Sequence, residues 1–490
     1  MKKKFIVSVL VLMLCIVAAM PMYADNNTGS SAADGKVPAK NIRLQSKKTK
    51  TKIKLNKKKA NVYVGKKLKL KVKGVKAKKV KWFTSNKKIA TVKKGVVKAK
   101  KKGRVTITAK VNGKKYKCKI TVKKSVKKPQ VKNKTTKMQT LFDRLDKGKN
   151  MVVSPLSLKY ALSMAANGAN DTARQGIESF LDTKTDTANS DLKKTMDMAE
   201  NDSMLTISNS FWYRDIYTIN SDYEKRLKEY YNADINKEIF DSSTVKKINQ
   251  WVYDKTDGMI DKIVDEITRD DIAFVMNAIL FEGKWTVPFE HEDTSKETFT
   301  KADGIKVKAD MMKGTVRHYY ENKKATGFEK TYGKNGEYSF IAILPKAKGN
   351  FKISDLNIDE FLVSGTNAYE VYIHLPKFEY CWESSLTDSL EQTSVKHIFN
   401  PLINPLDKMF LPTGENIYVG DIMQSCKVIM DEDGTKTAAV TSTQVKATSV
   451  PIENYKTKTV KLNRPFAYII KNNKTDEVMF MGKVMDPTQK

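Results

Sequence analysis

Histidine and cysteine are scarce in this chain of 490 residues, which contains four of each. Zinc sites and disulfide frameworks normally use such residues at short, regular spacings. Here no two cysteines form a CxxC pair, and no HExxH motif occurs. If Cys15 lies in a cleaved leader, three cysteines remain, an odd number. We therefore expect no metal, no cofactor and no disulfide framework.

Motifs of common enzyme classes are also missing. The sequence has no GxSxG elbow and no glycine-rich phosphate-binding loop. It has one long apolar run, Phe5–Met20, which is marginal in length for a membrane span. We predict that the chain is not an enzyme.

The first residues have the layout of a secretory signal. Lys2, Lys3 and Lys4 precede the apolar run, and Ala24 offers a small residue for cleavage. This pattern predicts a signal peptide over 1–24 and a secreted, extracellular protein. An uncleaved membrane anchor is the alternative.

Acidic residues are absent from a long stretch. Between Lys36 and Lys137 the chain has 41 lysines and arginines and no aspartate or glutamate, whereas 138–490 has 46 basic and 52 acidic residues. Two modules of opposite character are therefore joined. We predict a linker over 25–40, a basic domain over 41–123, a basic linker over 124–137 and a large domain over 138–490.

The basic domain alternates apolar residues with lysine or threonine. Tyr116, Cys118, Ile120 and Val122 show this period of two, and glycines separate the runs. The pattern predicts a small all-β sandwich. The segments Val80–Asn86, Ile89–Val92 and Gly103–Ala109 resemble the bacterial immunoglobulin-like (group 2) domain, which implies a spacer or adhesion role.

Two interpretations of the lysines stay open. They are either solvated strand faces or a surface that binds polyanions, such as anionic cell-wall polymers. The second interpretation would make the protein associated with the cell wall. Nucleic acid is not an expected partner, because no aromatic-interleaved platform or reading helix is evident.

The large domain mixes helical and strand patterns, which predicts an α+β fold with a large sheet. Residues 156–166 read as a helix that Gly168 ends. Ile260, Ile263 and Val264 also have helical spacing, next to Gly258. Residues 272–280 and 371–375 read as strands.

Six segments of this domain form an ordered set of motifs: Asn150–Ser157, Ile248–Val252, Asn277–Trp285, Leu375–Phe378, Asp431–Thr435 and Asn463–Phe466. The set resembles the serpins, a family of serine protease inhibitors. The resemblance implies the serpin fold, with a large central β-sheet, helices and an exposed reactive-centre loop.

The resemblance also implies a suicide mechanism. A protease cleaves the loop and becomes attached to it as an acyl-enzyme, and the cut loop then inserts into the main sheet. Partners would be serine proteases and, for some members, cysteine proteases, bound covalently by a monomer. Non-inhibitory serpins that act as surface binding or adhesion modules are the alternative.

The residues after Gly434 suit insertion as a half-buried strand. One face would carry only uncharged residues, from Thr435 and Thr437 to Val445, and Lys436 and Lys446 would lie on the other. The implied loop hinge comprises Glu432, Gly434, Thr435, Thr437, Ala438, Ala439 and Val440. Thr435 is expected to be the first residue to enter the sheet.

Register relative to the family predicts the cleaved bond at Thr448–Ser449, with Lys446–Ala447 as the second choice. A small β-branched Thr448 suits elastase-like or subtilisin-like proteases, whereas cleavage after Lys446 would indicate a trypsin-like target.

Further positions match the family's sheet-opening and loop-entry region. Gln424 replaces the histidine that is usual there, which puts the hydrogen bonding of the cluster in question. The predicted cluster comprises Ser154, Ser157, Asn277, Gln424, Trp285 and Lys377, the last paired with Glu432.

Overall fold

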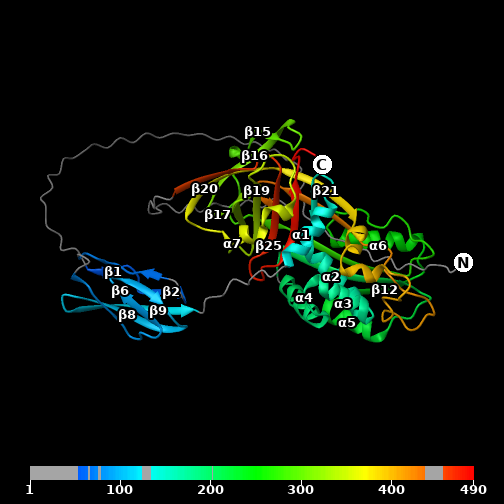
Figure 1. Ribbon diagram of the computed structural model, residues 1–490, viewed down its shortest axis with the longest axis horizontal. Coiled ribbons are helices and arrows are strands. Elements are labelled where there is room, and N and C mark those ends of the chain that lie inside the picture. The colour runs from blue at the N-terminus through cyan, green and yellow to red at the C-terminus, as the bar shows by residue number, and fades with distance from the viewer. Residues whose placement is uncertain are drawn as a thin grey trace, which may run out of the picture. The chain divides into compact units, whose positions relative to one another are not determined.

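The computed structural model describes residues 53–64, 67–75, 79–123, 134–200, 202–435 and 456–489. These residues fall into two compact units, one within Ala24–Lys132 and the other within Asn133–Lys490 (Figure 1). Within the described ranges, no helix is long and apolar enough to cross a membrane. Each unit has its own hydrophobic core.

The smaller unit consists of β-strands. Its four-stranded sheet has the order β2-β9-β8-β5, and a three-stranded sheet has the order β3-β7-β6. Val97, Ile107 and Cys118 are fully buried in the core that both sheets supply. The strands are β1 (Lys54–Leu55), β2 (Lys59–Tyr63), β3 (Lys67–Lys69), β4 (Val72–Lys73), β5 (Lys81–Thr84), β6 (Ala90–Lys93), β7 (Val96–Ala99), β8 (Gly103–Val111) and β9 (Lys114–Lys123).

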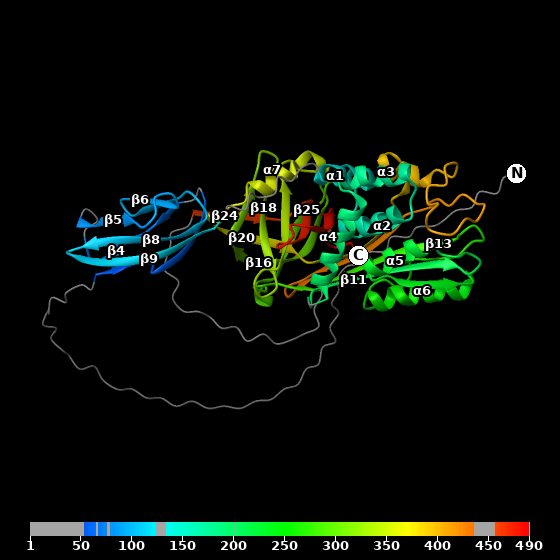
Figure 2. The same ribbon diagram turned by 90° about the horizontal axis from the view of Figure 1, so that it is seen from below.

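The larger unit combines helices with several sheets. Figure 2 shows β16, β20 and β24 gathered at one end of this unit and α2 and α3 toward the other. The helices are α1 (Lys134–Leu145), α2 (Pro155–Asn167), α3 (Asp171–Leu181), α4 (Thr185–Ala199), α5 (Ser221–Tyr231), α6 (Ser242–Lys255), α7 (Ile358–Val363) and α8 (Thr387–Glu391).

Two further sheets belong to the larger unit. One contains β10 (Met151–Val153), β26 (Val478–Val484), β25 (Phe466–Asn472), β19 (Tyr338–Pro345), β18 (Ala325–Tyr332) and β17 (His318–Glu321) in spatial order. The other contains β15 (Ser295–Thr300), β16 (Lys306–Val316), β20 (Tyr369–Pro376) and β24 (Lys456–Lys461).

The strands next to the predicted loop form two separate groups. One group is β12 (Asp234–Glu238), β11 (Leu205–Arg214) and β13 (Ala273–Phe281), and the other is β21 (Phe378–Ser385) and β22 (Met423–Met430). Their ends are joined by the short strands β14 (Gly283–Lys284) and β23 (Gly434–Thr435), which pair with each other.

Helix α2 supports both groups. Ser154 caps the helix by accepting a hydrogen bond from the Ser157 N–H, and Pro155 occupies its first turn, where no N–H is needed. The helix packs against β13, while Ser154 also bonds to Gln424 of β22. Helix α2 with its cap therefore connects the two strand groups a second time, in addition to the pairing of β14 with β23.

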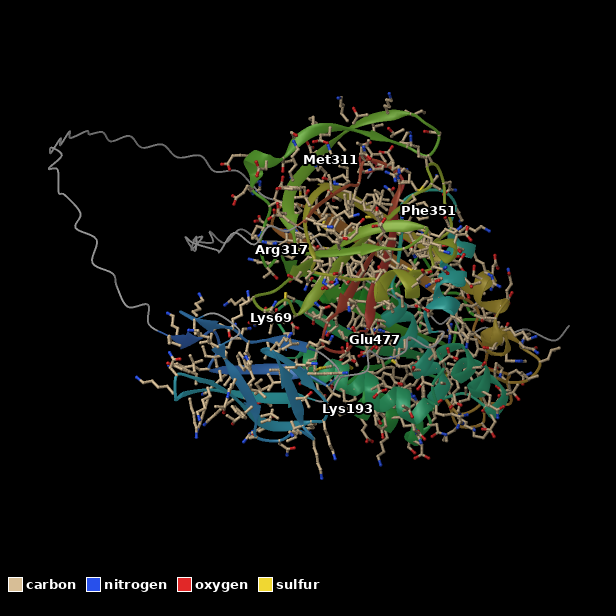
Figure 3. All side chains as sticks on the ribbon, turned by 60° about the vertical axis from the view of Figure 1, so that its left-hand side comes forward. Lys69, Lys193, Met311, Arg317, Phe351 and Glu477 are labelled. Atoms are coloured by element: carbon tan, nitrogen blue, oxygen red, sulfur yellow. The ribbon has the colours of Figure 1, made fainter. Side chains whose placement is uncertain are left out.

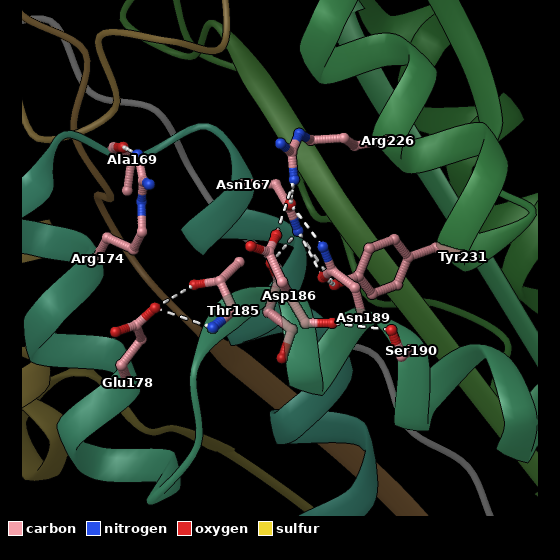
Figure 4. A network of polar contacts seen from close by, with 11 residues as sticks. Asn167, Ala169, Arg174, Glu178, Thr185, Asp186, Asn189, Ser190, Arg226 and Tyr231 are labelled. Atoms are coloured by element: carbon pink, nitrogen blue, oxygen red, sulfur yellow. Dashed lines mark hydrogen bonds and ion pairs between the residues drawn. The ribbon is translucent and has the colours of Figure 1, made fainter.

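A polar network ties α2 to its neighbouring helices (Figure 4). The side-chain amide of Asn167 on α2 donates to Asn189 Oδ1 on α4, which also accepts from the Tyr231 hydroxyl of α5. Tyr231 and Asn189 are buried, so these bonds replace the water that their polar groups would otherwise need. The network fixes the helical layer on which β11 and β13 rest.

Two sequence predictions need correction. Helix α1 begins at Lys134, inside the segment predicted as a linker over 124–137. The sequence pattern did not reveal its first turn, because that turn is basic and polar and the apolar pattern starts only at Met138. No helix forms over Ile260–Val264 either. Asn249 Oδ1 accepts from the N–H groups of Ile263 and Val264, which satisfies an extended backbone there.

Candidate functional site

Thr435, the last described residue before the predicted loop, already belongs to a strand pair. It pairs with Gly283 of β14, its side chain is fully buried, and its hydroxyl lies 2.7 Å from the Tyr332 hydroxyl. Thr435 is thus already paired with β14 in a two-stranded ladder of the native state, and its role as the first residue to enter the main sheet stays a prediction. Further insertion would start beyond it.

Glycine is required at position 434 for two reasons, its backbone conformation and the lack of space for a side chain. Its φ of +151° lies in a region that side chains rarely adopt, and an added Cβ would meet the Gly283 carbonyl oxygen at 2.1 Å. Gly283 faces a similar limit, because a Cβ there would lie 2.7 Å from the Tyr332 ring. Gly434 therefore allows β23 to approach β14 closely, and Gly283 leaves room for the rings of Phe281 and Tyr332.

Trp285 lies directly next to the junction. Its ring stacks on Tyr332 with 4.1 Å between centroids, and its indole N–H donates to the Asp431 carbonyl over 3.1 Å. Its backbone N–H donates to the carbonyl of Asp433. Trp285 therefore holds the turn that connects β22 to β23, and it is almost completely buried.

Glu432 forms an ion pair beside this turn. Lys377 Nζ lies 2.8 Å from Glu432 Oε2, and the Thr294 hydroxyl donates to Oε1 over the same distance. Burial by itself opposes ionisation of the carboxyl, but the hydrogen bonds from Lys377 and Thr294 outweigh it and lower the pKa of Glu432. The pair joins the hinge to the residue that precedes β21.

Sequence analysis missed Lys330, which lies beneath Trp285. Its side chain is buried, and Nζ lies 4.1 Å from the centre of the Phe289 ring and 5.2 Å from that of Trp285. It donates to the Val287 carbonyl and forms no ion pair within the described ranges. Burial lowers the pKa of Lys330 to about 7. The period-two pattern of β18 could have revealed it, because Lys330 shares a face with Phe328 and Tyr332.

The predicted sheet-opening cluster is divided between the two strand groups. Gln424 exchanges two hydrogen bonds of 3.2 Å with the backbone of Ser154, whereas Asn277 on β13 donates to Asn209 Oδ1 on β11. All three predicted residues here are buried, as is Ser157. Asn277 Oδ1 has no hydrogen-bond partner in the described part of the chain. Gln424 therefore holds β22 to α2, and Asn277 holds β13 to β11.

The remaining predicted positions, Thr437–Val440 and the bonds Thr448–Ser449 and Lys446–Ala447, lie outside the described residues. In the described ranges, no group of three or more histidine, cysteine, aspartate or glutamate residues could hold a metal ion.

Comparison with known proteins identifies the larger unit. Residues 132–487 match the family model described as serpin (serine protease inhibitor). The chain belongs to the serpin family. Residues 50–122 match the model of the bacterial Ig-like domain (group 2), so a bacterial immunoglobulin-like domain precedes the serpin domain.

Among curated relatives of this serpin, an uncharacterized serpin-like protein of Methanosarcina acetivorans is 29% identical over 357 residues, which cover 69% of this chain and 82% of that protein. Human antithrombin-III is 28% identical over 383 residues, covering 73% and 80%. The solved structure of the thermophilic serpin tengpin in its native state matches with a TM-score of 0.65 and 33% identity, covering 74% of this chain and 96% of tengpin.

Membership supports protease inhibition as the general function, and serpins are typically inhibitors of proteases rather than enzymes. The serpin fold alone does not make a protein a protease inhibitor, because some members of the family are non-inhibitory. Thyroxine-binding globulin, solved in complex with thyroxine, has the same fold at 19% identity and a TM-score of 0.62.

Proposed function

We propose that this serpin is a secreted inhibitor of serine proteases that acts by loop cleavage, acyl-enzyme formation and strand insertion. One observation carries the proposal. Among the strands that the structure describes, β13 pairs with β11 alone and β22 pairs with β21 alone. Among the described strands, each of the two therefore has one edge without a partner, and they are followed in the chain by β14 and β23, which pair with each other.

Unpaired backbone groups along two such edges favour the addition of a strand between them. The strand would continue from Thr435, which is already buried and paired. Thirteen further residues, 436–448, would span about 43 Å at about 3.3 Å each, which exceeds the ~27 Å length of β22 by a wide margin. An attached protease would thus be carried past the far end of the sheet.

The composition of the loop supports insertion as well. Residues on the face that begins with Thr435 and Thr437 are uncharged up to Val445, so that face can be buried without an unpaired charge. We propose Thr448–Ser449 as the cleaved bond and elastase-like or subtilisin-like enzymes as targets, because Thr448 suits a shallow specificity pocket. We propose some cysteine proteases as further targets, because they also form an acyl-enzyme with the chain that they cleave.

A direct test incubates the full chain with elastase, subtilisin and trypsin and analyses the mixtures by denaturing gel electrophoresis. We expect a complex with elastase or subtilisin that survives heat and SDS, and a released peptide that begins at Ser449 by mass spectrometry. Cleavage without any stable complex would support the alternative, a non-inhibitory serpin that acts as a binding module. A peptide beginning at Ala447 would move the bond to the second choice.

We also propose that the leader over 1–24 exports the protein and that the basic immunoglobulin-like domain retains it at anionic cell-wall polymers. The support is the absence of any carboxylate between Lys36 and Lys137. A polyanion bound there meets no like-charged side chain from this domain. Fractionation of cultures into medium and wall, followed by a wash in high salt, tests this role separately from inhibition.

A further inference from the structure

The immunoglobulin-like domain presents basic side chains in an ordered array. Its sequence contains no carboxylate, so its lysines have no acidic partner within the domain. Figure 3 shows long side chains with nitrogen at their ends projecting around this unit. The strand pairing determines which of these side chains share a face.

The outer face of the sheet β2-β9-β8-β5 is the larger array. Buried residues of β8 and β9 alternate with exposed ones, so the exposed set lies on one side of the sheet. Cross-strand pairing aligns Lys81 with Lys110 and Lys110 with Lys115, and the next rows add Lys117, Lys119, Lys59 and Arg104. Neighbours in such an array lie about 5 Å apart across strands and about 7 Å apart along them.

The array also contains groups that suit a sugar. Phe83 is 52% exposed, although burying a phenyl ring is normally favourable. Across the strands, Phe83 pairs with Thr108, and Thr108 pairs with Lys117. Two residues along β8 on the same face, Thr106 pairs with Lys119. An aromatic face can pack against the C–H groups of a sugar ring, threonine hydroxyls can bond to sugar hydroxyls, and the flanking ammonium groups can pair with anions.

The opposite sheet, β3-β7-β6, is a weaker candidate. Its strands have three or four residues each, and its exposed lysines are Lys67, Lys69, Lys93 and Lys98. Lys67 pairs with Lys98, and Lys69 and Lys93 flank Val96, with no exposed aromatic ring among the described residues of that sheet. This face therefore offers charge but no platform for a ring.

We propose that the outer face of the β2-β9-β8-β5 sheet binds an anionic polysaccharide, with Phe83 against a sugar ring and the surrounding lysines on its anionic groups. The proposal rests on the proposed retention at anionic wall polymers and specifies the surface and the chemistry of the partner. Double-stranded DNA is the competing polyanion. It offers charge but no exposed sugar-ring faces for Phe83.

The test uses the full chain and two variants of equal charge change. Lys110→Glu/Lys117→Glu/Lys119→Glu alters the proposed face, and Lys67→Glu/Lys69→Glu/Lys98→Glu alters the other. Polygalacturonate is the probe with sugar rings, linear polyphosphate is the probe without them, and double-stranded DNA is measured alongside as the competing polyanion. Binding is measured at about 50 mM and about 500 mM NaCl, because the charge-dependent part weakens as salt screens it.

We expect the first variant to lose roughly tenfold or more in affinity for polygalacturonate and the second to lose no more than about threefold. Phe83→Ser should weaken polygalacturonate binding by roughly fivefold and leave polyphosphate binding unchanged. Inhibition of protease and the melting temperature should be unaffected in each variant, which separates loss of binding from loss of folding.

Three outcomes would overturn parts of this account. Equal losses in the two charge variants would mean diffuse attraction rather than a binding face. Tighter binding of double-stranded DNA than of polygalacturonate, with the same dependence on the first face, would reassign the partner to nucleic acid. No binding of either probe by the unmodified protein would reject retention at wall polymers itself, whatever the variants do.

Discussion

Lys330 has surroundings that oppose its charge. The ammonium group contacts the faces of Phe289 and Trp285 and one backbone carbonyl, and these partners do not replace its hydration. Such a residue destabilises the native state next to the place where the loop joins the sheet. This placement is consistent with a native state that gains stability when the sheet is completed.

We predict that Lys330→Met stabilises the native protein. The pKa of Lys330 is lowered from 10.5 to about 7 on folding. The unfolded chain therefore binds a proton that the native state lacks between these pH values, so the penalty grows as pH falls toward 7 and is complete below it. This difference of about 3.5 pKa units corresponds to roughly 5 kcal/mol.

Urea unfolding between pH 6 and pH 10 measures this effect. The stability gained by Lys330→Met should be greatest near pH 6 and shrink toward pH 10. Lys334→Met, at an exposed position in the following turn, serves as the matched control and should change stability little. A gain that does not depend on pH would show that packing, not the buried charge, is responsible.

On the scale of the element, the burial of the hinge strand β23 determines which loop residue is suitable for a mutational test of insertion. Thr435 is buried in the native sheet, so an arginine there would damage the native fold as well as insertion. Thr437 is the next residue on the same predicted face. Lys436→Arg is its control, because it retains the charge at a position predicted to face solvent.

We predict that Thr437→Arg converts the inhibitor into a substrate. Insertion would have to bury an unpaired guanidinium, so it stalls, and the acyl-enzyme has time to hydrolyse. The moles of inhibitor consumed per mole of protease inactivated should rise from about one to roughly ten or more, whereas Lys436→Arg should stay near one. A Thr437→Arg protein that remains near one would contradict strand insertion.

The loop tip is a separate element with its own prediction. Thr448→Arg should shift preference from elastase toward trypsin, because it supplies a cation for the acidic pocket of trypsin. The ratio of the inhibition rates for the two proteases measures this shift, and it should move by roughly a hundredfold. If the unmodified protein inhibits trypsin fastest, the assignment of Thr448 fails and Lys446 becomes the specificity residue.

On the scale of the whole molecule, the two units have separate cores and separate predicted roles. Deletion of 25–132 should leave the rate of protease inhibition within about threefold, because the described hinge and the strands β11, β13, β21 and β22 all belong to the serpin domain. Deletion must stop at Lys132, since α1 begins at Lys134 and Lys137 pairs with Asp182 at 2.8 Å.

The same deletion should abolish salt-sensitive binding to anionic wall material. Sedimentation with purified walls measures binding, and the stopped-flow or progress-curve rate with elastase measures inhibition. Loss of inhibition in a folded deletion protein would show that the units act together. Retention that persists at high salt would show that charge is not what holds the protein at the wall.

Much of the fold follows from local sequence patterns. The helix predicted over 156–166 corresponds to α2, and the strands predicted over 272–280 and 371–375 correspond to β13 and β20. Helical spacing was misleading at Ile260, Ile263 and Val264. Those residues are buried by tertiary packing, and the side chain of Asn249 supplies the backbone bonds that a helix would otherwise provide.

Charge, periodicity and motifs are properties of residues close together in the chain, so they were enough to predict the two modules, the family and the composition of the loop. Three features of the site followed only from tertiary contacts: Thr435 already pairs with Gly283, Gln424 bonds to Ser154 rather than to Asn277, and Lys330 lies under Trp285. Each depends on contacts between residues roughly 45 to more than 250 positions apart. Periodicity along a strand states which face a residue occupies, but only the packing of distant elements determines what that face meets.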